Sequence, residues 1–89
     1  MSLSSKSFTA GPLRIMGWEF TEVGDIMAKH RHDKDGSHIS IVTGGKLLVR
    51  VTDQPDMIVE TKRVIDWPVG TEHEWECLEA PASIVNVWK

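Results

Sequence analysis

The sequence contains a single cysteine, Cys77, so a disulfide framework within the chain is excluded. One unpaired thiol is typical of a protein that folds in a reducing compartment. No apolar run approaches the roughly 18 residues of a transmembrane helix, and the start of the sequence lacks the pattern of a signal peptide. From these absences we expect a cytoplasmic protein with no membrane partner.

Positive charge is also scarce. Ten Lys and Arg residues stand against 13 Asp and Glu residues, which gives a formal net charge of −3. A surface that binds nucleic acid requires clustered positive charge, so we expect no nucleic-acid partner.

The length of 89 residues permits one domain, residues 1–89, with a polar start that we expect to be disordered over residues 1–7. A domain of this size buries only about 60–65% of the surface of its unfolded chain. A bound metal or a second subunit would therefore add to its stability.

Amphipathic helical periodicity is missing as well, whereas Gly, Pro, Asn and Asp recur at short intervals. These regularly spaced turn-forming residues predict an all-β fold, a small antiparallel barrel or sandwich of short strands. Gly44-Gly45 is typical of a two-residue hairpin loop that would pair Thr43 with Lys46. The expected strands are Leu13–Phe20, Ile26–His32, Ser37–Thr43, Lys46–Thr52, Met57–Thr61, Arg63–Asp66, Glu72–Leu78 and Ser83–Trp88.

Alternation within these strands predicts which side chains face the interior, because successive residues of a strand point to opposite faces. In residues 72–77 every second residue is Glu, so His73, Trp75 and Cys77 should face inward together. The same reasoning places three further sets of side chains. His38, Ser40 and Val42 should face inward, as should Leu47, Val49 and Val51, while Ile39, Ile41 and Leu48 should form an outward apolar patch. We expect a second subunit to cover this patch, and therefore a homodimer.

Three of the four histidines lie between Gly24 and Gly45. His30 and His32 are two residues apart on one strand, so both imidazoles point to one face at a separation that suits a shared metal. A turn at residues 33–36 brings His38 back beside them, and His73 must come from another strand. Neutral imidazoles suit Fe, Ni, Cu or Zn, so we predict a divalent transition metal as cofactor.

The spacing around these histidines resembles the first motif of the cupin superfamily, G-x5-H-x-H-x(3–4)-E-x6-G. Gly24, His30 and His32 match it directly, His38 stands in place of Glu, and Gly45 closes it. The second motif, G-x5-P-x-G-x2-H-x3-N, is matched only in part. Pro68, Gly70 and His73 agree with it, while Lys62 replaces its first Gly and Cys77 replaces its Asn.

This resemblance implies an RmlC-like jelly-roll barrel with a metal in its mouth. All-histidine cupin sites are similar to those of metal-dependent dioxygenases, so it also implies a small oxidoreductase that acts on a chelating organic molecule. A non-catalytic binding module or sensor with a structural metal is the alternative interpretation. The substrate site is expected to be lined by Ser40, Val49, Trp75 and Cys77.

General acid or base residues are hard to find in the sequence. No Asp or Glu falls clearly on the inward phase of a motif strand, so the catalytic residues stay unassigned and proton-shuttling reactions are disfavoured. Arg50 is a potential partner for a substrate carboxylate, but alternation turns it outward.

Overall fold

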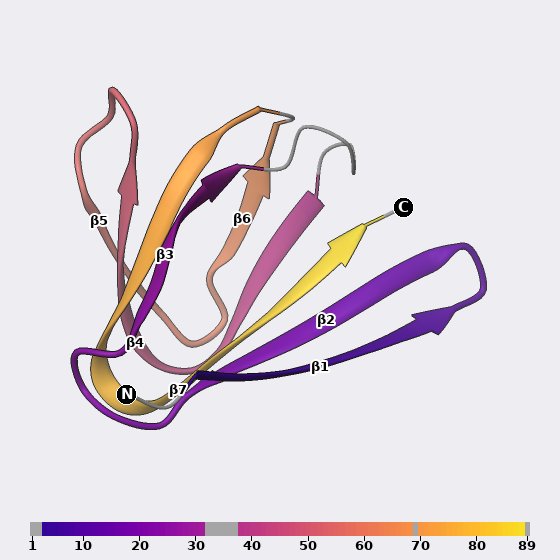
Figure 1. Ribbon diagram of the computed structural model, residues 1–89, viewed down its shortest axis with the longest axis horizontal. Helices are drawn as coiled ribbons and strands as arrows, with labels where there is room; N and C mark the ends of the chain where they lie inside the picture. The colour runs from indigo at the N-terminus through magenta and orange to yellow at the C-terminus, as the bar shows by residue number, and fades with distance from the viewer. Residues whose placement is uncertain (1–2, 32–37, 69, 89) are drawn as a thin grey trace.

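The computed structural model describes residues 3–31, 38–68 and 70–88, with the side chains of residues 3, 5–10 and 29–31 excepted (Figure 1). The strands are β1 (Leu3–Ala10), β2 (Leu13–Phe20), β3 (Ile26–Arg31), β4 (His38–Val51), β5 (Met57–Glu60), β6 (Val64–Trp67) and β7 (Glu72–Trp88). The described residues include no helix that is long and apolar enough to span a membrane.

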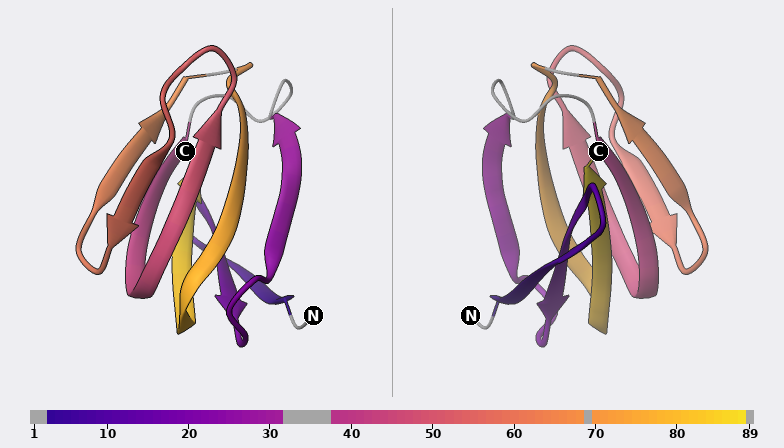
Figure 2. Two further views of the ribbon diagram at one scale, coloured as in Figure 1. Left: turned by 90° about the vertical axis from the view of Figure 1, so that its left-hand side faces the viewer. Right: turned by 90° about the vertical axis from the view of Figure 1, so that its right-hand side faces the viewer.

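The two long strands β4 and β7 organise the molecule, because they pair with each other along both of their halves. The first half of β4 pairs with the second half of β7, from His38 opposite Trp88 to Gly44 opposite Ser83. The remaining half of β4 pairs with the start of β7, where Val51 lies opposite His73. The other strands then complete two layers. Strands β1, β2 and β6 extend one layer, and β3 and β5 extend the other (Figure 2). The result is the antiparallel, all-β, jelly-roll type of barrel that the sequence predicts.

The start of the chain differs from the sequence-based expectation. Residues 3–7 were expected in a disordered tail, whereas β1 pairs with β2 from Leu3 opposite Phe20 to Ala10 opposite Leu13. Backbone pairing with β2 orders this polar segment without requiring it to be apolar, which is why composition alone missed it.

The predicted hairpin at Gly44-Gly45 is wrong. Strand β4 continues through these residues with register shifts on both sides of Gly44, and Lys46 lies opposite Glu79 and Glu60 rather than Thr43. Continuation is favoured because β7 is long enough to pair with β4 on both sides of the bend. β7 itself continues through a cis peptide bond at Ala80–Pro81, where the sequence predicted a break between two strands.

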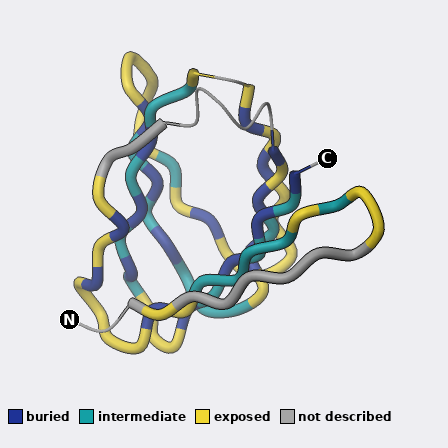
Figure 3. Tube along the Cα trace, turned by 45° about the vertical axis from the view of Figure 1, so that its right-hand side comes forward, coloured by how far each residue is buried: buried dark blue, intermediate teal, exposed yellow. Residues whose placement is uncertain are grey.

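The predicted facing of the side chains is nevertheless confirmed. Val42 and Leu47 are both buried, although they lie an odd number of residues apart on one strand. The bulge between them absorbs the extra residue, so the inward phase resumes after the bend. Figure 3 shows the buried residues recurring along the strands of both layers. The core consists of Phe20, Met27, Val42, Leu47, Val49, Val51, Val59, Ile65, Trp67, Trp75, Cys77, Ala82 and Ile84.

The predicted outward patch is divided by the same bend. Ile39 and Ile41 lie in the layer of β6, where Ile41 is opposite Val64. Leu48 lies in the other layer, between Ile58 and Glu76. The three residues therefore do not form one surface, because β4 crosses from one layer to the other between them.

The bend depends on glycine at one position. Gly45 has a φ of +70°, and a Cβ built there would lie 2.5 Å from the carbonyl oxygen of Glu79 and 2.6 Å from backbone atoms of Pro81 and Ala82. We call this meeting point of β4 and β7, residues 44–45 and 79–82, the corner. A side chain at residue 45 would force the two strands apart.

Replacing Gly45 by Ala should therefore destabilise the fold strongly. We expect Gly45→Ala to lower the free energy of unfolding by about 3 kcal/mol or more, from backbone strain and overpacking together. Gly11→Ala is the matched control, since Gly11 also has a positive φ (+61°) but a Cβ there meets nothing within 4 Å. Its cost should be only about 1 kcal/mol. Urea denaturation of both variants measures the difference, and equal effects would contradict the proposed close approach.

Candidate functional site

Two of the four histidines come together at one end of the barrel. His38 is the first residue of β4 and His73 the second residue of β7, and both point inward and are buried. Their ring centroids lie 6.0 Å apart, with the ring planes inclined by 47°. We call this end of the barrel, which holds the start of β4 and the start and end of β7, the histidine end.

The first motif contributes to the same place through its backbone. Residue His30 of β3 lies directly opposite His73 in the sheet, so β3 brings this residue to the histidine end. The side chain of His30 and all of His32 lie outside the described residues. Among the side chains that are described, no three His, Cys, Asp or Glu residues form a group that could hold a metal ion.

The described part of the donor set fits a divalent transition metal. Ring centres of two imidazoles bound to a common ion lie at most about 6.4 Å apart, because each metal–nitrogen distance is about 2.0–2.1 Å. The separation of His38 and His73 falls within this limit. Buried imidazoles in apolar surroundings suit Fe, Ni, Cu or Zn rather than Mg or Ca.

Each of the two imidazoles packs face to face on a tryptophan. The ring of Trp67 stacks on His73 at 4.2 Å between centroids, and Trp88 stacks on His38 at 4.8 Å. Trp75 approaches His73 edge-on at 6.3 Å. These aromatic contacts restrict the rotation of both imidazoles and limit the space that water can occupy around them.

A buried polar network holds one of these tryptophans in place. The indole N–H of Trp67 donates a hydrogen bond of 2.8 Å to the hydroxyl of Ser40, which in turn donates to the side-chain oxygen of Asn86. All three residues are buried. Ser40, expected to line the substrate site, thus faces inward as predicted, and its hydroxyl supports Trp67 from within the core.

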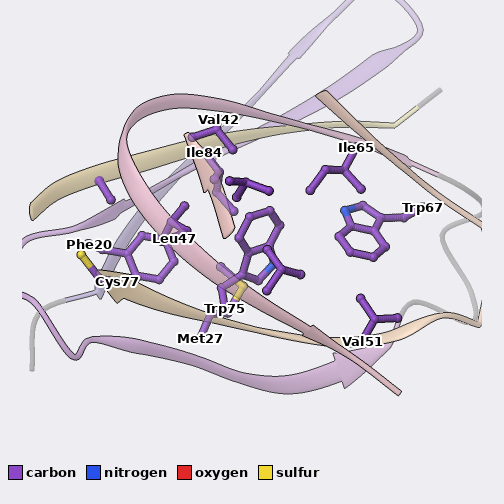
Figure 4. Close-up of a cluster of buried hydrophobic side chains, with 13 residues drawn as sticks. Phe20, Met27, Val42, Leu47, Val51, Ile65, Trp67, Trp75, Cys77 and Ile84 are labelled. Atoms are coloured by element: carbon purple, nitrogen blue, oxygen red, sulfur yellow. The ribbon is translucent and has the colours of Figure 1, made fainter. Parts of the chain in front are cut away.

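The remaining residues expected to line the substrate site lie at different depths. Val49 and Trp75 are buried cross-strand neighbours on β4 and β7. Cys77 is buried near Phe20, toward the corner and away from Trp67 (Figure 4). The structure therefore brings Trp75 to the histidines but places Cys77 toward the opposite end of the core.

The surroundings of Cys77 favour an inert thiol. Burial raises its pKa, and the negative charge of Asp25 raises it further, so the neutral thiol is the stable form at physiological pH. Asp25 is itself buried, and its carboxylate accepts hydrogen bonds from the backbone N–H groups of Thr21 and Glu22. Sequence reasoning missed this inward acid because Asp25 precedes β3 and belongs to a turn.

The two departures from the second motif have different structural settings. Lys62, in place of the motif glycine, adopts a φ of +78°, a left-handed conformation that glycine adopts without strain. Cys77, in place of Asn, is packed into the core as described above. Lys62 thus occupies a turn position whose backbone conformation favours glycine.

Sequence reasoning left the facing of Trp88 unresolved and did not consider Asn86. Trp88 and Asn86 lie on the inward phase of β7 together with Ile84, yet Val85 and Val87 on the other phase are also apolar. Because both faces of this segment carry apolar residues, alternation could not decide which one is inside. The contact of Trp67 with His73 depends on the pairing of β6 with β4, which the local sequence does not specify.

No protein-family model matches this sequence, and no curated protein sequence matches it significantly. Solved structures do match the fold. KdgF from Halomonas sp. superimposes with a TM-score of 0.84 at 18% identity, over 97% of this chain and 78% of that one. A cupin superfamily protein from Desulfitobacterium hafniense has a TM-score of 0.83 at 12% identity, over 98% of this chain and 76% of that one.

An enzyme is also among the matching structures. The DMSP lyase DddQ from Ruegeria pomeroyi has a TM-score of 0.83 at 14% identity, over 98% of this chain and 46% of the lyase. At these identities the likeness establishes the fold alone.

Proposed function

Because the chain has the cupin fold, we propose that His30, His32, His38 and His73 bind one divalent transition metal at the histidine end of the barrel. The observation that carries this proposal is the juxtaposition of His38 and His73, two buried imidazoles from opposite layers with ring centroids 6.0 Å apart. The register that sets residue 30 opposite His73 supports it.

We further propose that the protein is a small dioxygenase-like oxidoreductase acting on an organic molecule that chelates the metal. A metal held by neutral imidazoles would supply a centre that binds the substrate and activates O2. The chain itself would supply an apolar enclosure, in which Trp67 and Trp88 orient the imidazoles and exclude water. Trp75 and Val49 form the buried wall behind them.

A reaction that requires proton transfer by a carboxylate is less well supported. The carboxylate that is buried among the described residues, Asp25, lies beside Cys77 toward the corner, and it is already engaged by two backbone N–H groups. A general acid or base must reach the reacting atoms within hydrogen-bond distance, directly or through one water. This placement favours direct activation by the metal over isomerase or lyase chemistry.

Metal binding can be tested on single-residue variants. We expect the purified protein to bind about one equivalent of Fe, Ni, Cu or Zn, and His38→Ala or His73→Ala to weaken that binding about 100-fold or more, because each removes a nitrogen ligand. Cys77→Ala is the matched control, because this buried residue lies toward the corner, and it should keep full metal affinity. Elemental analysis and competition with a chromophoric chelator provide the measurement, and unchanged affinity in both histidine variants would refute the site.

Oxygen consumption distinguishes the oxidoreductase from the alternative of a non-catalytic binding module or sensor. We expect the Fe(II)-loaded protein to consume O2 in the presence of at least one member of a panel of diketones, thiols and phenolic acids. The Zn(II)-loaded protein should consume none, because Zn²⁺ is redox-inert. Binding of a panel member by calorimetry without O2 consumption under any of the four metals would instead support the binding module.

We also propose that the chain forms a homodimer through the outer face of the β2–β7–β4–β6 layer. Its apolar side chains are adjacent across the strands, since Ile39 lies opposite Val87 and Ile41 lies opposite both Val85 and Val64. Ile39 and Val64 are 41% and 56% exposed. A small domain has a thin margin of stability, and a second copy related by a two-fold axis can bury an apolar sheet face of this kind.

A charge placed on this face should prevent dimer formation. We expect Ile39→Lys to shift the protein from dimer to monomer, because a dimer would bury two uncompensated charges at its interface. Ile58→Lys is the matched control, since Ile58 is 62% exposed but belongs to the other layer, and it should leave the dimer intact. Analytical ultracentrifugation at micromolar concentration gives the masses, and a monomeric wild-type protein would rule out the dimer.

A further inference from the structure

The two buried imidazoles of the histidine end belong to different layers of the barrel. His38 lies opposite Trp67 in the layer of β6, whereas His73 lies opposite Val51 in the layer of β3 and β5. Sheet hydrogen bonds therefore hold each histidine in its own layer, and contacts across the interior must set the 6.0 Å between the ring centroids. A metal site requires its ligands to be placed to within about 0.5 Å.

Trp67 makes a contact of this kind, because its backbone belongs to one layer and its ring reaches the other. On β6 it lies opposite His38. Its ring stacks on His73 with 4.2 Å between the centroids and with the planes inclined by 19°. Trp75 meets the same indole edge-on at 6.1 Å. The position of the Trp67 ring therefore restricts the plane of the His73 ring.

The hydroxyl of Ser40 holds this indole from the strand that carries the other imidazole. Ser40 is two residues from His38 on β4, so the two side chains share the inner face of the barrel. The indole N–H of Trp67 donates a hydrogen bond of 2.8 Å to the Ser40 hydroxyl. A continuous path of contacts thus runs from β4, through Ser40 and the indole, to His73 in the opposite layer.

Asn86 sets the direction of that hydroxyl. It lies opposite Ser40 in the pairing of β4 with β7, and its side-chain oxygen accepts the hydroxyl proton. A serine hydroxyl has one proton to donate, so donation to Asn86 leaves an oxygen lone pair for the indole of Trp67. All three side chains are buried, where the loss of a partner is costly. Because the network consists of protein groups alone, it can hold the indole before any metal binds.

We propose that Ser40 and Asn86 are positioning residues of the metal site, and that they act through the ring of Trp67. The network sets the separation of the two buried imidazoles. This inference rests on the metal site proposed above and assigns the residues behind it. Ser40 was expected to contact substrate, whereas its hydroxyl is engaged by Trp67 and Asn86. Ligands that are held in place beforehand lose less conformational freedom on binding, so the metal binds more tightly.

Zinc affinity measures the proposed role. We expect Ser40→Ala to weaken Zn²⁺ binding about 10-fold, because the loss of a residue behind the ligands typically costs about 10- to 100-fold. Val59→Ala is the matched control for a loss of stability, since Val59 is also buried but lies opposite Leu47, near the corner. It should keep wild-type zinc affinity. Competition with a chromophoric chelator, at a temperature where each variant is folded, gives the affinities.

A double-mutant cycle with Trp67→Phe shows whether Ser40 acts through the indole. Phenylalanine keeps an aromatic ring against His73 but has no N–H to donate. In the Trp67→Phe background, Ser40→Ala should therefore leave zinc affinity unchanged, while it still lowers the unfolding temperature because the bond to Asn86 is lost. Equal effects of Ser40→Ala on zinc affinity in the two backgrounds would overturn the route through Trp67.

Hydrogen exchange tests the network in the metal-free protein. By NMR, we expect the indole proton of Trp67 to exchange slowly with solvent in the wild type and about 10-fold faster in Ser40→Ala, where its acceptor is missing. The resonance is assigned by its absence from the spectrum of Trp67→Phe. Exchange in the wild type as fast as that of an exposed indole would overturn the inference, because the ring would not be held before metal binding.

The possible failures are distinguishable. A Ser40→Ala protein with wild-type zinc affinity would overturn the positioning role and leave the metal site standing. A wild-type protein that binds no zinc would overturn the metal site and the positioning role together, whatever the exchange rate of the indole proton.

Discussion

The pairing of β4 with β7 is the constraint on which the rest of the structure depends. These strands stay hydrogen-bonded on both sides of the corner, so each contributes to both layers. Their bend is possible because Gly45 allows backbone contact at a distance that no side chain permits. From that arrangement it follows that the start of β4, the start of β7 and the end of β7 all arrive at one end of the barrel, and with them His38, His73 and Trp88.

The histidine end combines aromatic stacking with buried hydrogen bonds. Trp67 contacts His73 through its ring face and is held through its N–H by Ser40, whose own hydroxyl is satisfied by Asn86. A buried polar group without a partner would cost about 1–3 kcal/mol of stability. Each of these two hydrogen bonds therefore helps to hold all three side chains in one arrangement. Such mutual restriction is what a metal site requires of the residues behind its ligands.

Much of the fold could be predicted from local patterns. Turn residues located the strands, and alternation identified the buried faces at His38, Ser40 and Val42 and again at His73, Trp75 and Cys77. The hairpin at Gly44-Gly45 was wrong because a two-glycine turn and a two-glycine bend have the same local sequence. Only the pairing with the distant strand β7 distinguishes them, since Gly44 lies opposite Ser83 and Lys46 lies opposite Glu79.

The site was harder to predict than the fold for a related reason. The spacing of His30, His32 and His38 predicts a shared metal within one segment, whereas the contacts of Trp67 and Asn86 depend on which strands are neighbours. Cys77 was expected at the substrate site because it shares a face with His73. Strand β7 runs the length of the barrel, however, so residues on its inner face lie at different distances from the histidine end. Position along the barrel axis follows from the cross-strand register, which no single strand specifies.

The two ends of the barrel should differ in how well they tolerate amino-acid substitutions. The aromatic residues of the histidine end lie within two residues of a strand end, as His38 begins β4, His73 follows the first residue of β7 and Trp88 ends it. The close backbone approach at Gly45, where a Cβ would meet Glu79, Pro81 and Ala82, lies at the far end. Substitutions at the histidine end can therefore change the side chains there while the corner continues to secure the shape of the barrel. A scaffold built in this way is a practical starting point for engineering new ligand preferences into a very short chain.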